Sequence, residues 1–277
     1  MNSKKPVLVT TDGSPRSHRV LPHAALLATA LNAPLVLVQV LDGSESDGDA
    51  AQKSAVDTLA HLHIEGDVRV EAREGRETTT SAVLRVADQL DAAVLALDSR
   101  GHGALRHALH GSVAADLLQN ASIPVLVSGP NLELAAHEAA PYRIVATSDG
   151  SKASEALLHH LTALGESEGC NVTLLRVHEH EPGKLDDAAA VQLHRDELEA
   201  ARKLMPESMQ VEVVLREIPR GAGVDTAIIE KAQEVEAHAI AMSTQGHSAR
   251  RHVVIGSVAL TLLGRSPVPL LLARAEV

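Results

Sequence analysis

Short runs of consecutive apolar residues alternate along this chain with longer stretches in which apolar residues recur every three or four positions. Nearly continuous Val- and Leu-rich runs are typical of strands buried on both faces of a parallel sheet. The longer spacing is typical of helices with one apolar face. In the first half the pattern predicts strands at 7–9, 35–40, 68–72, 93–97 and 123–127, and helices at 16–31, 50–62, 79–90 and 112–119.

The second half repeats the same order, with expected strands at 144–146, 172–177, 211–215, 239–242 and 270–272. Strand–helix alternation of this kind predicts right-handed crossovers and an open, doubly wound parallel sheet of the Rossmann-like α/β class. Ser14, followed by Pro15, is expected to cap the first helix, and Ser151 to cap its counterpart. We therefore expect two α/β domains, each with a five-stranded parallel sheet.

Two sequence motifs also occur twice, in the same order. Residues 9–14, Val-Thr-Thr-Asp-Gly-Ser, return as Ala-Thr-Ser-Asp-Gly-Ser at 146–151. Gly-His at 101–102, ten residues before Gly-Ser-Val at 111–113, returns at 246–247, again ten residues before Gly-Ser-Val at 256–258. Two copies in one order indicate two domains of one fold, so a single chain can form a built-in dimer.

The stretch at 129–141 is bounded by Pro130 and Pro141 and lies between the two copies. We expect a first domain at 1–130, a linker at 131–141 and a second domain at 142–277. The distance between matching residues grows from 137 positions at the first motif to 145 at the second, so the second copy carries eight extra residues. Most fall within 179–205, which we interpret as a solvated surface segment without chemistry.

The last expected strand of each copy, Ile123–Val127 and Val268–Leu272, is strongly apolar and has Pro near its start. Proline is tolerated at the start of an edge strand. An exposed apolar edge promotes aggregation. We therefore expect the two halves to pack against each other, as a pseudo-twofold pair, through these strands.

Composition narrows the classes of ligand and partner. The 277 residues include no Phe or Trp and one Tyr, so aromatic stacking of a base is nearly excluded, and backbone and aliphatic groups must hold any ligand. The formal net charge of −11 disfavours nucleic acid, which needs a basic face. Lys4 and Lys5 precede too short an apolar run for a secretory signal, and no run has the roughly 20 residues of a membrane span. These features predict a cytoplasmic protein.

Candidate binding residues gather where the expected strands end, because ligands of doubly wound sheets bind at the carboxyl ends of the strands. Free N–H groups at a helix N-terminus, beside a Ser hydroxyl, form an anion site. The Gly-Ser-Val segments open such helices, although they and the two Asp residues could instead be simple turns and caps. The first crevice would comprise Thr10, Asp12, Val40, Leu97, Asp98, Gly101, Gly111, Ser112 and Val113, and the second Thr147, Asp149, Val177, Met242, Ser243, Gly246, Gly256, Ser257 and Val258.

These motifs resemble those of the universal stress proteins, once per half and over nearly the whole chain. The family's ATP-binding pattern is Gly-x-x-Gly, nine residues, then Gly-Ser or Gly-Thr; Gly101, Gly111, Gly246 and Gly256 match its second and third glycines. The resemblance implies a flavodoxin-like fold with strand order 3-2-1-4-5. It also implies adenine near the first-strand Asp and second-strand Val, with phosphates on the glycine loop.

One position departs from that pattern. The first glycine is replaced by Asp98 in one copy and Ser243 in the other. Ser is small and uncharged, so the second crevice should accept a nucleotide. The Asp98 carboxylate, if unpaired, would repel phosphates; it could instead bond ribose hydroxyls or help to hold a metal. We expect weaker binding in the first copy.

Other polar residues leave alternatives open. Arg100, His102, Arg106, His107 and His110, and the matching His247, Arg250, Arg251 and His252, could neutralise a triphosphate or form solvated basic loops. We interpret His159-His160 and His178-x-His180 as surface residues, and predict no metal site, because the chain has no His-Glu-x-x-His or Cys/His motif. Cys170, the one cysteine, is expected to be a small buried apolar residue.

The sequence offers no catalytic motif: it lacks a P-loop and a Gly-x-Ser-x-Gly elbow. The leading hypothesis is a stress-response regulatory protein that binds ATP, with or without Mg²⁺, and more strongly in its second half. ATP would shift its conformation or its set of partners, with turnover slow or absent; a homodimer and an unidentified protein partner are compatible with this. The alternative is a nucleotide-free scaffold that acts through its tandem interface, and a slow ATPase or transferase comes last.

Overall fold

The computed structural model of the chain describes residues 4–42, 45–99, 112–133, 141–164, 169–180, 187–244 and 255–274. The first half contains β1 (Val7–Thr11), the 3₁₀ turn η1 (Ser17–Val20), α1 (Leu21–Ala30), β2 (Leu35–Leu41), α2 (Glu45–His61), β3 (Asp67–Ala72), α3 (Thr79–Gln89), β4 (Val94–Asp98), α4 (Ser112–Asn120) and β5 (Val125–Ser128). The second contains β6 (Tyr142–Thr147), α5 (Lys152–Leu164), β7 (Cys170–His180), α6 (Asp187–Arg202), β8 (Gln210–Pro219), α7 (Val224–Glu234), β9 (Ala239–Ser243), α8 (Ser257–Arg265) and β10 (Leu270–Ala273).

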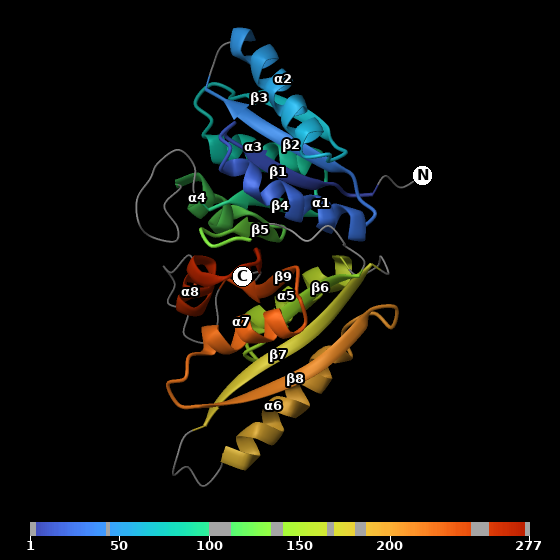
Figure 1. Ribbon diagram of the computed structural model, residues 1–277, viewed down its shortest axis with the longest axis vertical. Helices are drawn as coiled ribbons and strands as arrows, with labels where there is room; N and C mark the ends of the chain where they lie inside the picture. Colours follow the sequence, from blue (N-terminus) through green and yellow to red (C-terminus); the bar gives the residue numbers. More distant parts are fainter. Residues whose placement is uncertain are drawn as a thin grey trace.

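All ten of these strands form one sheet, in the order β3-β2-β1-β4-β5-β10-β9-β6-β7-β8 (Figure 1). Each half therefore has the expected internal order 3-2-1-4-5, with every pairing inside a half parallel. The expectation of two separate five-stranded sheets is wrong, because β5 and β10 pair antiparallel and make the sheet continuous.

The join between the halves is the pairing of their last strands. Val127 lies opposite Leu270, Leu126 opposite Leu271, and Val125 opposite Leu272, all within the antiparallel ladder. These side chains are at most 2% exposed, so the ladder buries two apolar edges at once. The expectation that these strands meet is confirmed, and the pairing removes the open edges that would otherwise invite aggregation.

Helices cover both faces of the sheet, and two apolar cores result. On one face α1, α2, α5 and α6 pack against alternate strand residues such as Val7 and Ile144. On the other face α3, α4, α7 and α8 pack against the residues between them, such as Leu8 and Val145. Both cores run through both halves, which is how the near-continuous apolar runs of the strands are satisfied.

The first helix begins differently from the expectation. Ser14 Oγ does accept a hydrogen bond from the backbone N–H of Ser17 at 3.2 Å, as a cap would. The turn that follows is 3₁₀, and the α-helix begins only at Leu21, with Pro22 in its first turn. Proline has no N–H to donate to a preceding carbonyl, so it is favoured at the start of an α-helix.

Two residues that the sequence marks as unusual are both buried. Cys170 is 3% exposed, and burial raises the pKa of its thiol to about 11, so it behaves as the small apolar residue expected. Tyr142 is fully buried and stacks on His238, with ring centroids 5.0 Å apart; its burial raises the pKa of the phenol. Neither side chain is available to a ligand at the surface.

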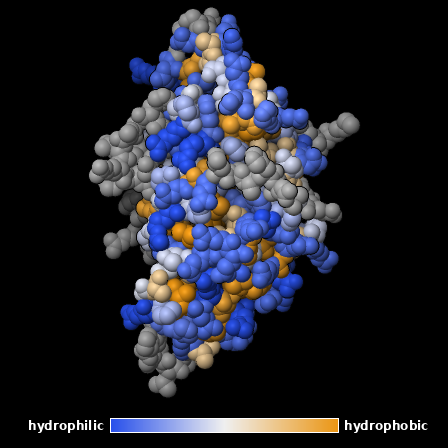
Figure 2. Space-filling model, viewed as in Figure 1, coloured by the Kyte–Doolittle hydropathy of each residue, from blue (hydrophilic) through white to orange (hydrophobic). Residues whose placement is uncertain are grey.

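The face of the molecule in Figure 2 is mainly hydrophilic, with smaller apolar patches between. Among the described residues the large apolar side chains that stay well exposed are Val56, Leu193 and Leu204. None of the described helices is both long and apolar enough to cross a membrane.

Candidate functional site

The second half contains a cavity of about 730 Å³ where β6, β7 and β9 end and α8 begins. Most ligand pockets have volumes of about 300–1,000 Å³. It lies at the carboxyl ends of the strands, where β6 and β9 are neighbours and the chain order reverses. Its lining includes every residue proposed for the second crevice except Gly246, which lies outside the described residues: Thr147, Asp149, Val177, Met242, Ser243, Gly256, Ser257 and Val258.

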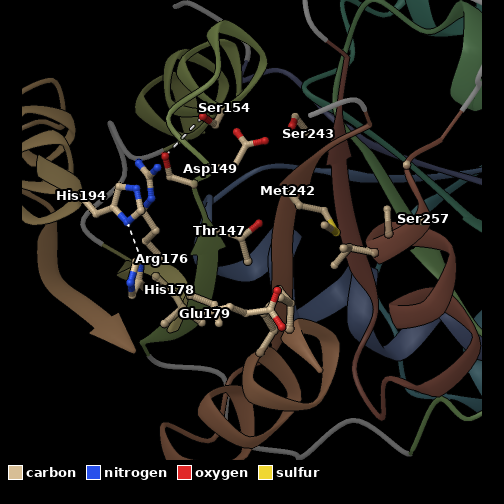
Figure 3. A pocket seen from close by; sticks show the side chains of 18 of the residues that line it. Thr147, Asp149, Ser154, Arg176, His178, Glu179, His194, Met242, Ser243 and Ser257 are labelled. Atoms are coloured by element: carbon tan, nitrogen blue, oxygen red, sulfur yellow. Dashed lines mark hydrogen bonds between the residues drawn. The ribbon is translucent and has the colours of Figure 1, made fainter. Parts of the chain in front are cut away.

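The turn after β6 places the Asp149 carboxylate at the cavity (Figure 3). Gly150 has a φ of 77°, a left-handed conformation that favours glycine. The backbone N–H of Ser151 donates to Asp149 Oδ1 at 3.0 Å, so Asp149 does cap the turn. Ser154 N–H donates to Ser151 Oγ at 3.3 Å, which confirms Ser151 as a helix cap. The capping bond fixes the direction of the carboxylate, so capping and lining the cavity are compatible roles.

The opposite wall combines an apolar surface with the start of a helix. Met242 and Ser243 end β9, and Gly256 is the N-cap residue of α8. The N–H of Gly256 donates to the carbonyl of Thr244 at 2.8 Å, which ties this end of the helix to the strand end. Ser257 and Val258 then supply the first turn of α8, and both line the cavity. The free N–H groups of this first turn suit a negatively charged group.

Strand β7 and helix α6 form a third wall of the cavity, which the sequence analysis did not predict. Residues Arg176, His178 and Glu179 of β7, and Asp187, Ala190 and His194 of α6, also line the cavity. The interpretation of 179–205 as a segment without chemistry is therefore wrong for α6, and His178, expected at the surface, is only 7% exposed. Strand β7 is longer than expected and continues to His180. The period-two alternation Arg176, His178, His180 is the signal that could have revealed this.

Charged groups on this wall are paired with one another. Arg176 Nη1 contacts Glu197 Oε2, and Asp187 accepts from both His178 Nε2 at 2.9 Å and His180 Nδ1 at 2.5 Å. The hydrogen bond from His180, then that from His178, lowers the pKa of the Asp187 carboxyl, and the same contact raises the pKa of His180. Burial lowers the pKa of His194, with Arg176 acting in the same direction. This side of the cavity is thus polar and titratable.

The first half repeats the turn that carries Asp149 in the second half. Asp12 Oδ1 accepts from Ser14 N at 3.0 Å, and Gly13 has a φ of 78°, so the two turns match closely. Thr10, Val40, Leu97, Ser112 and Val113 lie on β1, β2, β4 and α4. Gly101 and Gly111, and the basic loops at 100–110 and 247–252, lie outside the described residues.

Asp98 is the main difference in the first half. Its side chain is 3% exposed, accepts a hydrogen bond from Ser128 Oγ at 2.7 Å and lies 3.9 Å from Arg16 Nε. The carboxylate that we considered as an unpaired charge therefore has partners within the fold. Its negative charge still lies at the end of β4, where the second half has Ser243.

The universal stress protein family model matches residues 4–128 and 142–274. The chain belongs to the universal stress protein family. Its two matches cover nearly all of both halves, so the repeat seen in the motifs is a repeat of the whole family domain. No curated protein sequence matches this universal stress protein significantly.

Solved structures similar to this universal stress protein support the fold. A universal stress protein from Archaeoglobus fulgidus has 19% identity and a TM-score of 0.63, with 100% of each chain covered. A Pseudomonas aeruginosa protein assigned to the same family has 15% identity and a TM-score of 0.63, covering 98% of this chain and 93% of its own. A shorter Archaeoglobus fulgidus universal stress protein, solved with dAMP, has 26% identity over 45% of this chain and a TM-score of 0.38. Its ligand is a fact about that protein alone, because the overlap is low.

Proposed function

We propose that the second half of this universal stress protein binds an adenine nucleotide, ATP in preference, in the 730 Å³ cavity. The observation that carries the proposal is that Asp149, Val177, Ser243 and the start of α8 line one cavity at the carboxyl ends of three strands. The family resemblance assigns adenine to the Asp and Val side and phosphates to the glycine side.

The chemistry of the cavity fits this orientation. Val177, Val224, Ile228 and Met242 give an apolar surface for the flat base, which this chain must hold without aromatic side chains. At the other end, the N-terminal N–H groups of α8 and the Ser257 hydroxyl can donate to phosphate oxygens. The base therefore lies over aliphatic groups while the anionic end lies at a helix N-terminus.

The proposed role is regulatory. The two domains, 1–130 and 142–277 with the linker 131–141, form an intramolecular pseudo-dimer in which one site binds ATP more tightly than the other. Nucleotide binding would shift the conformation of the protein or its set of protein partners, with turnover slow or absent.

Calorimetric titration of the full chain with Mg-ATP tests the site. We compare the wild-type chain with Gly256→Asp and the neutral, similarly sized Gly256→Asn. Among the described residues, a Cβ at Gly256 would meet the Thr244 carbonyl, at 3.7 Å, and the φ of −68° suits any residue, so both variants should fold. Both Asp and Asn are good N-cap residues.

Gly256→Asp should abolish binding in the second half, because its charge occupies the helix N-terminus in place of a phosphate, whereas Gly256→Asn should retain most of the affinity. Unchanged affinity in Gly256→Asp would refute the site. A wild-type chain that binds no adenine nucleotide at all would favour the nucleotide-free scaffold.

A further inference from the structure

The far end of β7 carries a cluster of metal-ligand side chains. Strand β6 pairs with β7 as far as Leu175. Within the described part of the chain, the residues of β7 beyond Leu175 pair with β8 alone, through the ladder that joins His178 to Glu217 and His180 to Pro219. Alternation along the strand places His178 and His180 on the same face. Asp187, at the first position of α6, lies against both of them.

The donor atoms of these three residues converge. His178 Nε2 lies 2.9 Å from Asp187 Oδ1 and His180 Nδ1 lies 2.5 Å from Asp187 Oδ2, and the ligand atoms of the three residues all lie within 4.8 Å of one another. Ligands at about 2.0–2.2 Å from a tetrahedral Zn²⁺ ion are separated by roughly 3.4 Å. A small opening of the two hydrogen bonds would admit such an ion.

The ring nitrogens that face away from Asp187 also have partners. His180 Nε2 lies 3.1 Å from Glu217 Oε2, and His178 Nδ1 lies 3.2 Å from His194 Nδ1. A ligating imidazole usually donates its other ring N–H to such a group, a carboxylate above all, which fixes the orientation of the ring. Glu217 and His194 would thus be positioning residues around the ligands.

We propose that His178, His180 and Asp187 bind a divalent transition-metal ion of the Zn²⁺ class. Two imidazole nitrogens and one carboxylate oxygen are a donor set that suits such ions, and three protein ligands leave a coordination position open for water or a ligand. His178 and Asp187 also line the 730 Å³ cavity, so the open position would face the space offered to a nucleotide.

The first half provides an internal comparison. The residues that match His178 and His180 are Leu41 and Gly43, neither of which offers a metal ligand through its side chain. The site would therefore belong to the second half alone, and one ion per chain is the expected stoichiometry. The experiment uses metal without nucleotide, so the outcome is separate from that of the proposed ATP site.

The test is a metal titration of the full, tag-free chain after treatment with a chelator. ZnCl₂ is added in a calorimeter, and CoCl₂ is added in parallel, because tetrahedral Co²⁺ with nitrogen and oxygen ligands gives a visible absorption spectrum. The wild-type chain should bind one Zn²⁺ and develop that spectrum. His180→Gln and Asp187→Asn should each lower the affinity by more than about tenfold, as should Glu217→Gln through its effect on His180.

His159→Gln is the matched control, because His159 is an exposed histidine on α5, outside the cluster. The Zn²⁺ affinity of this variant should equal that of the wild-type chain. Stoichiometric binding that His180→Gln and Asp187→Asn weaken and His159→Gln does not would support the site. A wild-type chain that binds no Zn²⁺, or that binds it equally in all variants, would overturn it. If a cluster variant fails to fold, the Co²⁺ spectrum of the wild-type chain decides. A tetrahedral spectrum at one ion per chain would support the site, and an octahedral spectrum would contradict it.

Discussion

The two halves of this chain share one backbone design but differ in charge at matching positions. Strand β4 ends at Asp98, which pairs across the ladder with Ser128, while β9 ends at Ser243, which pairs with Ala273. The position of Arg16 in the first half corresponds to Ala153 in the second. The first half thus places an Arg–Asp–Ser group where the second has small side chains.

On the side of the site formed by the second strand of each half, the second half has the charged or titratable residues. Gln39 of β2 corresponds to Arg176 of β7, and Leu41 corresponds to His178. The turns between these walls are nearly the same, with φ of 78° at Gly13 and 77° at Gly150. The turn geometry therefore belongs to the fold, whereas the ligand chemistry depends on side chains that differ between the halves.

The largest effect is expected when the second half receives the negative charge of the first. Ser243→Asp should weaken ATP binding by about 100-fold, or about 2.7 kcal/mol, because Ala153 and Ala273 offer the new carboxylate no side-chain partner. Calorimetric titration with Mg-ATP measures the change. Ser243→Asn is the neutral control and should lose much less affinity; equal losses in the two variants would show that size rather than charge matters.

The two left-handed glycines should differ in how well they tolerate a side chain. A Cβ at Gly13 would lie 3.1 Å from Gln39 Nε2, but at Gly150 it would lie 2.7 Å from Arg176 Nη1 and 2.9 Å from Glu197 Oε2. Gly13→Ala should destabilise the fold by about 1 kcal/mol, mainly through backbone strain, and Gly150→Ala by about 2 kcal/mol, because its Cβ would also displace the Arg176–Glu197 ion pair. Chemical denaturation of the two variants measures this; a larger effect at Gly13 would contradict the structural difference.

The converse exchange gives the first half the chemistry of the second. In a chain whose second site carries Gly256→Asp, Asp98→Ser should tighten ATP binding in the first half about tenfold, because it removes a negative charge and leaves Arg16 to attract phosphate. Arg16→Ala alone should not produce this gain. A loss of ATP affinity in Asp98→Ser would mean that the carboxylate bonds ribose or a cation instead.

A smaller difference lies in the matching histidines His23 and His160. His23 is 4% exposed and its Nε2 lies 3.0 Å from the Glu133 carbonyl, whereas His160 is half-buried. Burial lowers the pKa of His23, despite the bond to Glu133, and His238 and Arg19 act in the same direction as burial.

As the pH falls below about 6.5, His23 is therefore protonated in the unfolded chain before it is protonated in the folded chain. The folded state loses stability relative to the unfolded state over this pH range. We expect His23→Gln to flatten the pH dependence of the unfolding free energy between pH 7 and 5 by less than about 1.4 kcal/mol per pH unit. Denaturation curves at several pH values measure it, with His160→Gln as the control. An unchanged slope in His23→Gln would contradict this role.

Apolar runs predicted the strands well, because continuous runs such as Val7–Val9 or Ala239–Met242 are typical of strands that are buried on both faces of a sheet. The same reasoning placed the motif residues of the second half around one cavity, since strand ends of a doubly wound sheet converge. It identified Leu126 and Leu271 as edge residues but not their antiparallel pairing, which depends on how two complete halves fit together.

The third wall escaped prediction for a physical reason. Hydrophobic periodicity reports which face of an element meets the apolar core, and Leu198 and Ala201 of α6 do so. Asp187 and His194 meet a polar cavity instead, and in the sequence such residues look the same as solvated ones. Their proximity to His178 arises because α6 packs against β7, which the spacing of residues along the chain does not encode.

The antiparallel join of β5 and β10 has an evolutionary consequence. In a symmetric homodimer each substitution appears in both subunits, so a change that disables one site disables both. Here the two faces of the interface are encoded separately, as Val125–Ser128 and Leu270–Ala273, and covalent linkage keeps them together at any concentration. The two halves of one chain can therefore vary independently, as they do where Asp98 on one side corresponds to Ser243 on the other.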